Sequence, residues 1–154
     1  MCWTGCGSVM GNSRKSPRPV PQNDIWIHPK TKIPYSGEYD VVEEGVRLKM
    51  ELKDGRPNGR WQRWYNSGRP HEEYLFVKGQ RDGLQVSWYP NGQKMMEAQF
   101  RQGQMLNAQS WRPNGEKASA MSNGTGTLIL FDSEGRKRSE SVYQNGRRVN
   151  RRDF

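Results

Sequence analysis

The chain of 154 residues is poor in the side chains that build catalytic and metal sites. It has two cysteines, Cys2 and Cys6, and two histidines, His28 and His71. A Cys-x3-Cys pair needs a second pair of cysteines or histidines to hold zinc, and none follows it. The histidines lie far apart, with no obvious acid or nucleophile as a partner, so we interpret them as surface or turn residues. We therefore expect no metal and no cofactor.

The signatures of common enzyme classes are also missing. There is no phosphate-binding loop, no dinucleotide-binding glycine motif, no zinc-protease helix and no G-x-S-x-G elbow. The 17 glycines fall at turn positions instead of at a strand-to-helix phosphate cradle. Carboxylates recur only at the interval of an internal repeat, which explains them without catalysis. We expect the protein not to be an enzyme.

Apolar residues are scarce as well. Only 32% of the chain is hydrophobic, and no apolar run is long enough for a transmembrane helix. This supply is too small for a thick two-layer core, although six tryptophans and six tyrosines add buriable area. Regularly spaced aromatics and turn signals argue against disorder. A thin sheet of repeats, each packing on its neighbours, fits this composition better.

Net charge is +9, and its distribution is uneven. Residues 37–135 carry 13 Lys or Arg and 13 Asp or Glu and are therefore neutral. The excess lies in 1–36, with five basic and one acidic residue, and in 136–154, with seven basic and two acidic residues. A nucleic-acid binder is expected to place its basic stripe on the folded face. The neutral centre disfavours a nucleic-acid partner.

The N-terminal stretch has a feature of exported proteins. Thr4-Gly5-Cys6 resembles the end of a bacterial lipoprotein signal, in which small residues precede a cysteine that takes a diacylglyceryl group. Trp3 replaces the usual Leu, and the apolar run is missing, which a start codon further upstream would explain. Residues 1–23 are then the end of a truncated signal and a flexible linker. The alternative is that both cysteines are ordinary residues of a cytoplasmic chain.

An internal repeat organises the rest of the chain. The stretch Gly59–Gly79, G-RWQRWYNSG-RPHEEYLFVKG, matches Gly83–Gly103, G-LQVSWYPNG-QKMMEAQF-RQG, at a shift of 24 residues. Less regular units run over 37–55, 106–124 and 126–146, and unit 106–124 has lost its opening glycine. Alternating apolar and polar residues around a glycine turn predict one β-hairpin for each unit.

Four kinds of position recur across these units. The first is a set of turn and boundary glycines: Gly59, Gly68, Gly79, Gly83, Gly92, Gly103, Gly126, Gly135 and Gly146. The second is an aromatic residue four positions before the turn glycine: Trp64, Trp88, Trp111 and Phe131. The third is a bulky residue near the closing glycine: Leu52, Phe76, Phe100 and Tyr143. The fourth is a glutamate three positions before the bulky residue: Glu73, Glu97 and Glu140. This offset predicts one aromatic face and one charged face, with the glutamates in cross-strand ion pairs.

The pattern G-x-x-x-x-W-Y-x-x-G-x-x-x-x-E-x-x-x-x-x-G of residues 59–79 resembles the MORN-repeat variant. This variant occurs in the YwqK-type antitoxin components of bacterial toxin–antitoxin systems. The resemblance covers about residues 37–149, roughly three quarters of the chain. It implies an all-β fold, a single-layer elongated antiparallel sheet of successive hairpins. It also implies a non-enzymatic scaffold that binds a protein partner such as a toxin.

We divide the chain into the segment 1–23, a lead-in at 24–36, an array of about five hairpins at 37–149 and a basic tail at 150–154. A single-layer sheet cannot hide both of its faces, so exposed aromatics are candidates for partner binding. The expected anchors are Trp64, Tyr65, Trp88, Tyr89 and Trp111.

The alternative function is that of an envelope lipoprotein. Lipid attachment at Cys6 would hold the protein at the membrane, facing the periplasm, where it binds lipid or envelope partners; without it we expect a cytoplasmic protein. The irregular unit at 106–124 and the basic ends depart most from the repeat. We expect the features particular to this protein to lie there.

Overall fold

The computed structural model describes residues 19–22 and 25–154, and every regular element in these ranges is a strand. Strands β1 (Val20–Gln22) and β2 (Ile25–Ile27) form a small sheet of their own. The others form one 12-stranded antiparallel sheet. They are β3 (Gly37–Glu43), β4 (Val46–Lys53), β5 (Arg56–Trp64), β6 (Pro70–Val77), β7 (Gln80–Arg81), β8 (Gly83–Trp88), β9 (Lys94–Arg101), β10 (Gln104–Trp111), β11 (Lys117–Ser122), β12 (Thr125–Phe131), β13 (Lys137–Gln144) and β14 (Arg147–Asp153). The expected all-β, single-layer antiparallel fold is confirmed.

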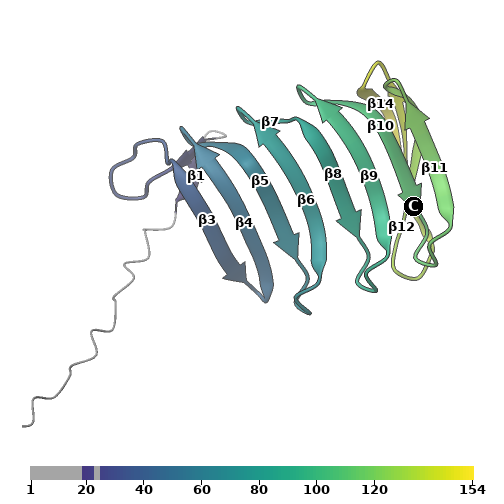
Figure 1. The fold of residues 1–154 in the computed structure, drawn as a ribbon, viewed down its shortest axis with the longest axis horizontal. Helices are drawn as coiled ribbons and strands as arrows, with labels where there is room; N and C mark the ends of the chain where they lie inside the picture. The colour runs from purple at the N-terminus through teal and green to yellow at the C-terminus, as the bar shows by residue number, and fades with distance from the viewer. Residues whose placement is uncertain (1–18, 23–24) are drawn as a thin grey trace, which may run out of the picture.

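The strands of the large sheet lie side by side in chain order, from β3 at one edge to β14 at the other (Figure 1). Only the two-residue β7 leaves this path, and it pairs with β6. Each unit of the sequence repeat is one hairpin: β3–β4, β5–β6, β8–β9, β10–β11 and β12–β13. Because all pairings are local, each unit is held by its neighbours in the manner of a repeat protein.

The turns of the second to fifth hairpins share one hydrogen-bond pattern. In the second hairpin the Tyr65 amide donates to the Arg69 carbonyl at 2.9 Å, and the Gly68 amide donates to the Tyr65 carbonyl at 2.8 Å. Gly68 has a φ of +80°, which glycine adopts without the steric cost that a side chain brings. The ladder shifts register by one residue between Arg63 and Trp64. This β-bulge recurs at Trp88, Trp111 and Phe131.

The lead-in is more structured than the sequence suggests. Residues 20–22, expected to belong to a flexible linker, form β1 and pair with β2 through the register Pro21↔Trp26. Trp26 then packs against Tyr39 of the large sheet, with 5.0 Å between ring centroids. This contact holds the small sheet against the large one. Such a contact cannot be predicted from the composition of the segment. The first 18 residues, Cys6 among them, lie outside the described residues.

The expected basic tail at 150–154 is also different in the structure. Residues 147–153 form β14, which pairs with β13 through partners such as Ser141↔Arg151 and Glu140↔Arg152. Strand pairing uses backbone groups that every residue other than proline carries, so a basic composition does not prevent it. Ion pairing between Arg151 and Asp153 reduces the local repulsion.

The sheet curls at its C-terminal end, so that β12 and β14 lie behind β10 and β11 in Figure 1. We call the side enclosed by this curl the inner face and the opposite side the outer face. A first inner cluster joins Met96, Phe100, Met105, Met121 and Leu128 from four strands. A second fills the flatter N-terminal half: Tyr39, Val41, Met50 and Leu52, with Trp26, Tyr35, Leu48 and Trp61 against it.

The size of the inner side chains matches the curl. In the curled half, buried inner positions include several small residues: Ser87, Ala98, Ala108, Ser110, Ser139 and Ser141. Small side chains let opposing parts of a sheet approach closely. In the flat half the inner positions carry large residues such as Tyr39 and Trp61, which need more depth. The repeat therefore supplies the hairpins, and side-chain volume on one face sets how tightly they roll.

Candidate binding surface

A row of aromatic rings crosses the outer face near the hairpin turns. Trp64, Trp88 and Trp111 end the strands β5, β8 and β10, which are two strands apart in the sheet. Since neighbouring strands lie about 4.8 Å apart, rings on every second strand repeat at about 9.6 Å. All three tryptophans are half-buried, so part of each ring is accessible. We call these three residues the tryptophan row.

Cations pack over the rings of this row and of its continuation. The Arg47 guanidinium lies 5.2 Å from the Trp64 ring centroid, and the Lys94 ammonium lies 5.2 Å from that of Trp111. Beyond the row, Arg112 lies 4.3 Å from Phe131. Contacts of this type contribute about 0.5–1 kcal/mol each at exposed sites. The outer face therefore combines aromatic and charged groups.

The recurrent glutamates lie on this same outer face. Glu97 accepts from Lys94 at 2.5 Å, and Glu140 pairs with Lys137 in the equivalent position of the last full hairpin. Only Glu73 reaches across strands, to Arg60 at 3.8 Å. The bulge after the turn brings residues three apart onto one face, so the pairs form mostly within a strand. The expectation of separate aromatic and charged faces is wrong for the tryptophans. Val86 pairs with Glu97, and Trp88 follows Val86 by two residues, so Trp88 lies on the same face as the glutamate.

The two tyrosines that follow the tryptophans have a different place. Tyr89 is only 2% exposed, and its hydroxyl donates to the Trp111 carbonyl at 2.8 Å. Tyr65 makes the equivalent bond to the Trp88 carbonyl at 2.6 Å. Burial raises the pKa of Tyr89 to about 12 and also raises the pKa of Tyr65. These side chains link successive turns, so Tyr89 in particular is not available as a partner anchor.

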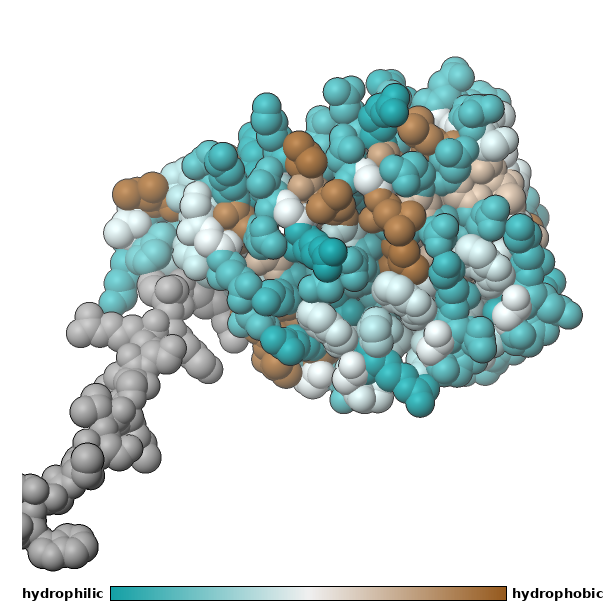
Figure 2. Space-filling view, in the orientation of Figure 1, coloured by the Kyte–Doolittle hydropathy of each residue, from teal (hydrophilic) through white to brown (hydrophobic). Residues whose placement is uncertain are grey.

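An apolar strip lies on the same outer face as the tryptophan row, over β6 and β8 and about 13 Å further along the strands. Leu75, Val77 and Leu84 are 40%, 46% and 50% exposed, which is high for aliphatic side chains within a sheet. They belong to the outer face, because the register pairs Glu73 with Val86 and strands alternate every residue. Figure 2 shows brown apolar side chains gathered over the middle of the sheet. We call these three residues the apolar strip.

Next to the strip, the outer face of β8–β12 holds an open groove of about 410 Å³. It is lined by Leu84, Glu97, Ala98, Gln99, Asn107, Ala108, Gln109, Ala120, Met121, Ser122 and Thr125. Ala98, Ala108 and Met121 are buried in the inner cluster, and the other eight residues lie on the outer face. Six of the lining residues come from the irregular unit 106–124. Sequence reasoning pointed to that unit but did not identify the side chains, because the groove takes residues from five strands.

The inner face carries a charged cluster between the two apolar clusters. Tyr74 donates its hydroxyl to Glu72 at 2.7 Å, and Glu72 lies 3.7 Å from the His71 ring nitrogen. Burial lowers the pKa of His71, and Arg63 lowers it further, while Glu72 opposes both. The buried Ser87 hydroxyl, whose residue pairs with Glu72, has no hydrogen-bond partner within the described residues.

The turns and boundaries of the hairpins are held by polar side chains that the repeat pattern only partly revealed. All nine framework glycines have positive φ, from +73° to +146°. At the other end of the hairpins, Asn58 Oδ1 accepts from the Lys78 amide at 3.1 Å, and Asp82 accepts from the Gln102 amide at 3.2 Å. In the sequence, this cap is indicated by an Asn or Asp directly before the opening glycine of a unit, as in Asn58-Gly59 and Asp82-Gly83.

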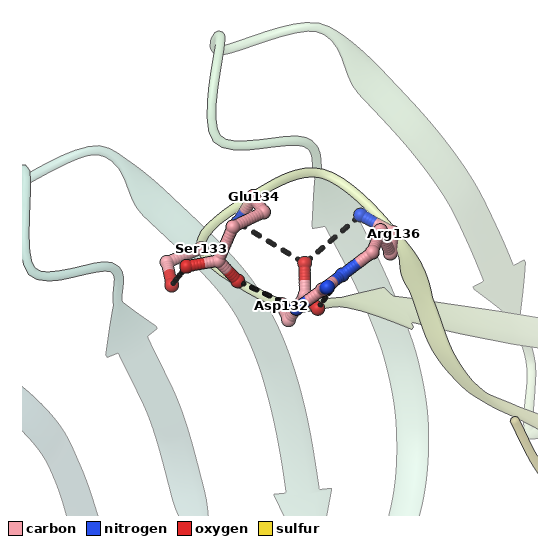
Figure 3. Close-up of polar contacts among 4 residues, drawn as sticks. All are labelled: Asp132, Ser133, Glu134 and Arg136. Carbon is pink, nitrogen blue, oxygen red and sulfur yellow. Dashed lines mark hydrogen bonds and ion pairs between the residues drawn. The ribbon is translucent and has the colours of Figure 1, made fainter.

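The turn of the fifth hairpin is the most heavily bonded of these (Figure 3). Asp132 Oδ1 accepts from the backbone amides of Glu134 and Arg136 at 3.0 and 2.9 Å, and Oδ2 accepts from the Arg136 guanidinium at 2.7 Å. Desolvation raises the pKa of Asp132, but the hydrogen bonds from Arg136 outweigh it and hold that pKa below its usual range. Asn91 and Asn114 cap other turns from a different position, directly before the turn glycine, and each accepts from the amide two residues on.

Among residues 19–22 and 25–154, no group of three or more His, Cys, Asp or Glu side chains is arranged to hold a metal ion. No helix in the described chain is suited to spanning a membrane. Lipid attachment at Cys6 concerns a residue outside these ranges and stays a prediction.

Comparisons with known proteins do not test the resemblance to a family. No protein-family model matches the chain. No curated protein matches it either. The resemblance to the MORN-repeat variant and to YwqK-type antitoxin components therefore rests on the repeat residues themselves.

Proposed function

We propose that the protein is a non-enzymatic scaffold that binds a protein partner through the outer face of its sheet. The observation that carries this proposal is the apolar strip, Leu75, Val77 and Leu84, exposed on the same face as the tryptophan row. Contiguous exposed apolar surface is costly in water and is typical of docking sites. Tryptophan is the residue type most enriched at the energetic centres of interfaces.

The chemistry of the surface indicates the kind of partner. Charges around the strip are matched in pairs, such as Arg60 with Glu73 and Lys94 with Glu97, so they provide little net attraction for a charged surface. Affinity would come from apolar contact with Leu75 and Leu84 and from ring packing on Trp64 and Trp88. We therefore expect a protein that presents an uncharged apolar surface. The resemblance to antitoxin components makes a toxin the first partner to test.

Charge placed in the strip tests this function. Leu75→Asp and Leu84→Asp introduce a carboxylate at exposed positions, so the fold is expected to persist while apolar docking is lost. Val42→Asp is the matched control, because Val42 is an exposed aliphatic residue, 60% exposed, on the distant strand β3. A partner captured by the wild-type chain should be retained by Val42→Asp and lost by both strip variants. Equal capture by all three variants would rule out the strip as the docking surface.

A further inference from the structure

The open groove on the outer face of β8–β12 has a chemistry distinct from that of the apolar strip. Glu97 is the one carboxylate in its lining, and Lys94 pairs with it at 2.5 Å. The other outer-face side chains of the lining are three amides, two hydroxyls, Ala120 and Leu84. A groove with neutralised charge does not favour an ionic ligand. It suits an uncharged ligand rich in hydrogen-bonding groups.

The polar side chains of the groove retain most of their hydrogen-bonding capacity. Gln99, Gln109, Ser122 and Thr125 are exposed and make no side-chain hydrogen bond to any described residue. Asn107 uses Oδ1 to accept from the Asn123 amide at 3.2 Å, which leaves its NH2 group available. Amides and hydroxyls can donate and accept at once, as sugar hydroxyls do. The lining therefore matches a polyhydroxylated ligand.

The floor of the groove lies at Ala120. Ala120 is exposed on the outer face, and its short side chain allows a ligand to approach the sheet beside Gln109, its register partner. Ala98 and Ala108 are buried in the inner cluster behind it. The volume of about 410 Å³ lies within the range of small-ligand sites, about 300–1,000 Å³. Because the groove is formed on the exposed outer face, it admits a chain that continues beyond it on either side.

The tryptophan row adjoins this groove. Trp111 follows Gln109 by two residues on β10, about 7 Å along the strand. Lys94 connects the two regions, since it bonds Glu97 in the groove and packs over the Trp111 ring. Half-buried tryptophan rings provide flat apolar platforms on which the C–H face of a pyranose ring can stack. Their spacing of about 9.6 Å is comparable with the two-sugar repeat of an extended β-1,4-linked chain.

We propose that this groove, together with Trp88 and Trp111, binds a neutral linear oligosaccharide. The glutamines, Asn107 and the hydroxyls of Ser122 and Thr125 hydrogen-bond the sugar hydroxyls, and the tryptophans stack on the rings. This inference goes beyond the proposed protein-binding function and uses different residues, except that Leu84 borders both surfaces and Trp88 belongs to both. A scaffold with both surfaces would hold its protein partner against a glycan.

Calorimetric titration of the full chain with cellohexaose and with chitohexaose tests the proposal. We expect saturable binding of at least one of these hexasaccharides. Gln99→Ala combined with Gln109→Ala removes two hydrogen-bonding side chains and should weaken binding about tenfold or more. The matched control is Gln80→Ala, an exposed glutamine outside the groove, which should bind as the wild type does.

A second variant fills the groove instead of removing its bonds. Ala120→Arg places a long side chain over the exposed floor and should abolish binding while thermal unfolding by circular dichroism stays cooperative. The proposal is overturned if neither hexasaccharide binds, or if the double glutamine variant binds as tightly as Gln80→Ala. Leu75→Asp lies outside the groove, so sugar binding by that variant with loss of the protein partner would separate the two functions.

Discussion

Tyr89 donates its phenolic hydrogen to the backbone carbonyl of Trp111, 2.8 Å away in the next hairpin. The same bond joins Tyr65 to the Trp88 carbonyl one repeat earlier. Each tyrosine thereby fixes the carbonyl of the tryptophan on the following unit, and a row of surface rings is positioned by a buried row of hydroxyls. The Trp-Tyr pair of the repeat has two roles: the first residue faces outward and the second ties the hairpins together.

Loss of this hydroxyl should destabilise the array without disrupting packing. Tyr89→Phe keeps the ring and removes one buried hydrogen bond, so we expect the free energy of unfolding to fall by about 1 kcal/mol. Unfolding by denaturant measures this difference in free energy between the variant and the wild type. Tyr143→Phe is the control, since the Tyr143 hydroxyl makes no hydrogen bond to a described residue. A similar loss in both variants would show that the Tyr89 bond has no particular role.

The same tyrosine predicts instability in alkali. Burial raises the pKa of Tyr89 from 10.0 to about 12, so the folded state retains a proton that the unfolded state releases. The stabilisation is fully present below pH 10 and is lost as pH rises towards 12. Tyr89→Phe should therefore show a shallower fall of unfolding free energy across this window. Identical slopes for the variant and the wild type would contradict the assignment.

A serine pair stabilises the sheet where β11 and β12 diverge. Ser110 Oγ and Ser119 Oγ lie 2.6 Å apart, and Ser119 Oγ also accepts from the Ile129 amide at 2.8 Å. Ser119→Ala removes the hydroxyl that bonds both the Ser110 hydroxyl and the Ile129 amide. The loss should lower the free energy of unfolding by about 1–3 kcal/mol. The double variant with Ser110→Ala should cost less than the sum of the single variants, as a double-mutant cycle would measure. Strict additivity would mean that the two hydroxyls do not interact.

Two glycines with similar backbone angles should respond differently to substitution. A Cβ on Gly135, at φ +81°, would meet nothing within 4 Å, so Gly135→Ala should cost only the left-handed strain of about 1–2 kcal/mol. A Cβ on Gly124, at φ +75°, would overlap the Gly146 backbone nitrogen, so Gly124→Ala should cost more than that strain alone. The midpoints of thermal unfolding of the two variants compare these costs. Equal midpoints would show that the close approach of the two turns carries no cost.

The turn at Asp132 should confer sensitivity to acid. Its depressed pKa gives a stabilisation that is present above the unfolded value of 3.8 and is lost as pH falls through the folded value. Asp132→Asn keeps a side-chain oxygen that can accept from the Glu134 and Arg136 amides, and removes the charge that the Arg136 guanidinium contacts. We expect the variant to unfold with a weaker dependence on pH below 4, measured by urea titration at several pH values. An unchanged dependence would exclude Asp132 as its source.

Much of the fold could be predicted from particular residues. Gly59, Gly68 and Gly79 mark where a chain must turn, and the alternation between them marks strands. Glycine position and period-two alternation are local properties of the sequence, so they can be recognised without the tertiary structure. The five hairpins and their order along one sheet followed from these signals. The exposed tryptophans were also identified this way, although their face was not.

The binding surface depended on relationships between strands. The register of β8 with β9 placed Trp88 and Glu97 on one face, because Glu97 pairs with Val86, two residues before Trp88. Tyr89 was expected to be a partner anchor, but it is buried and cannot contact a partner. The groove could not be read from the sequence at all, because Leu84, Gln99 and Thr125 meet only through the register of neighbouring strands. The amino-acid sequence determined which segments become hairpins, since turn and strand preferences are local. The tertiary structure alone decided how tightly the sheet curls and which side chains share a surface, since both depend on packing between distant residues.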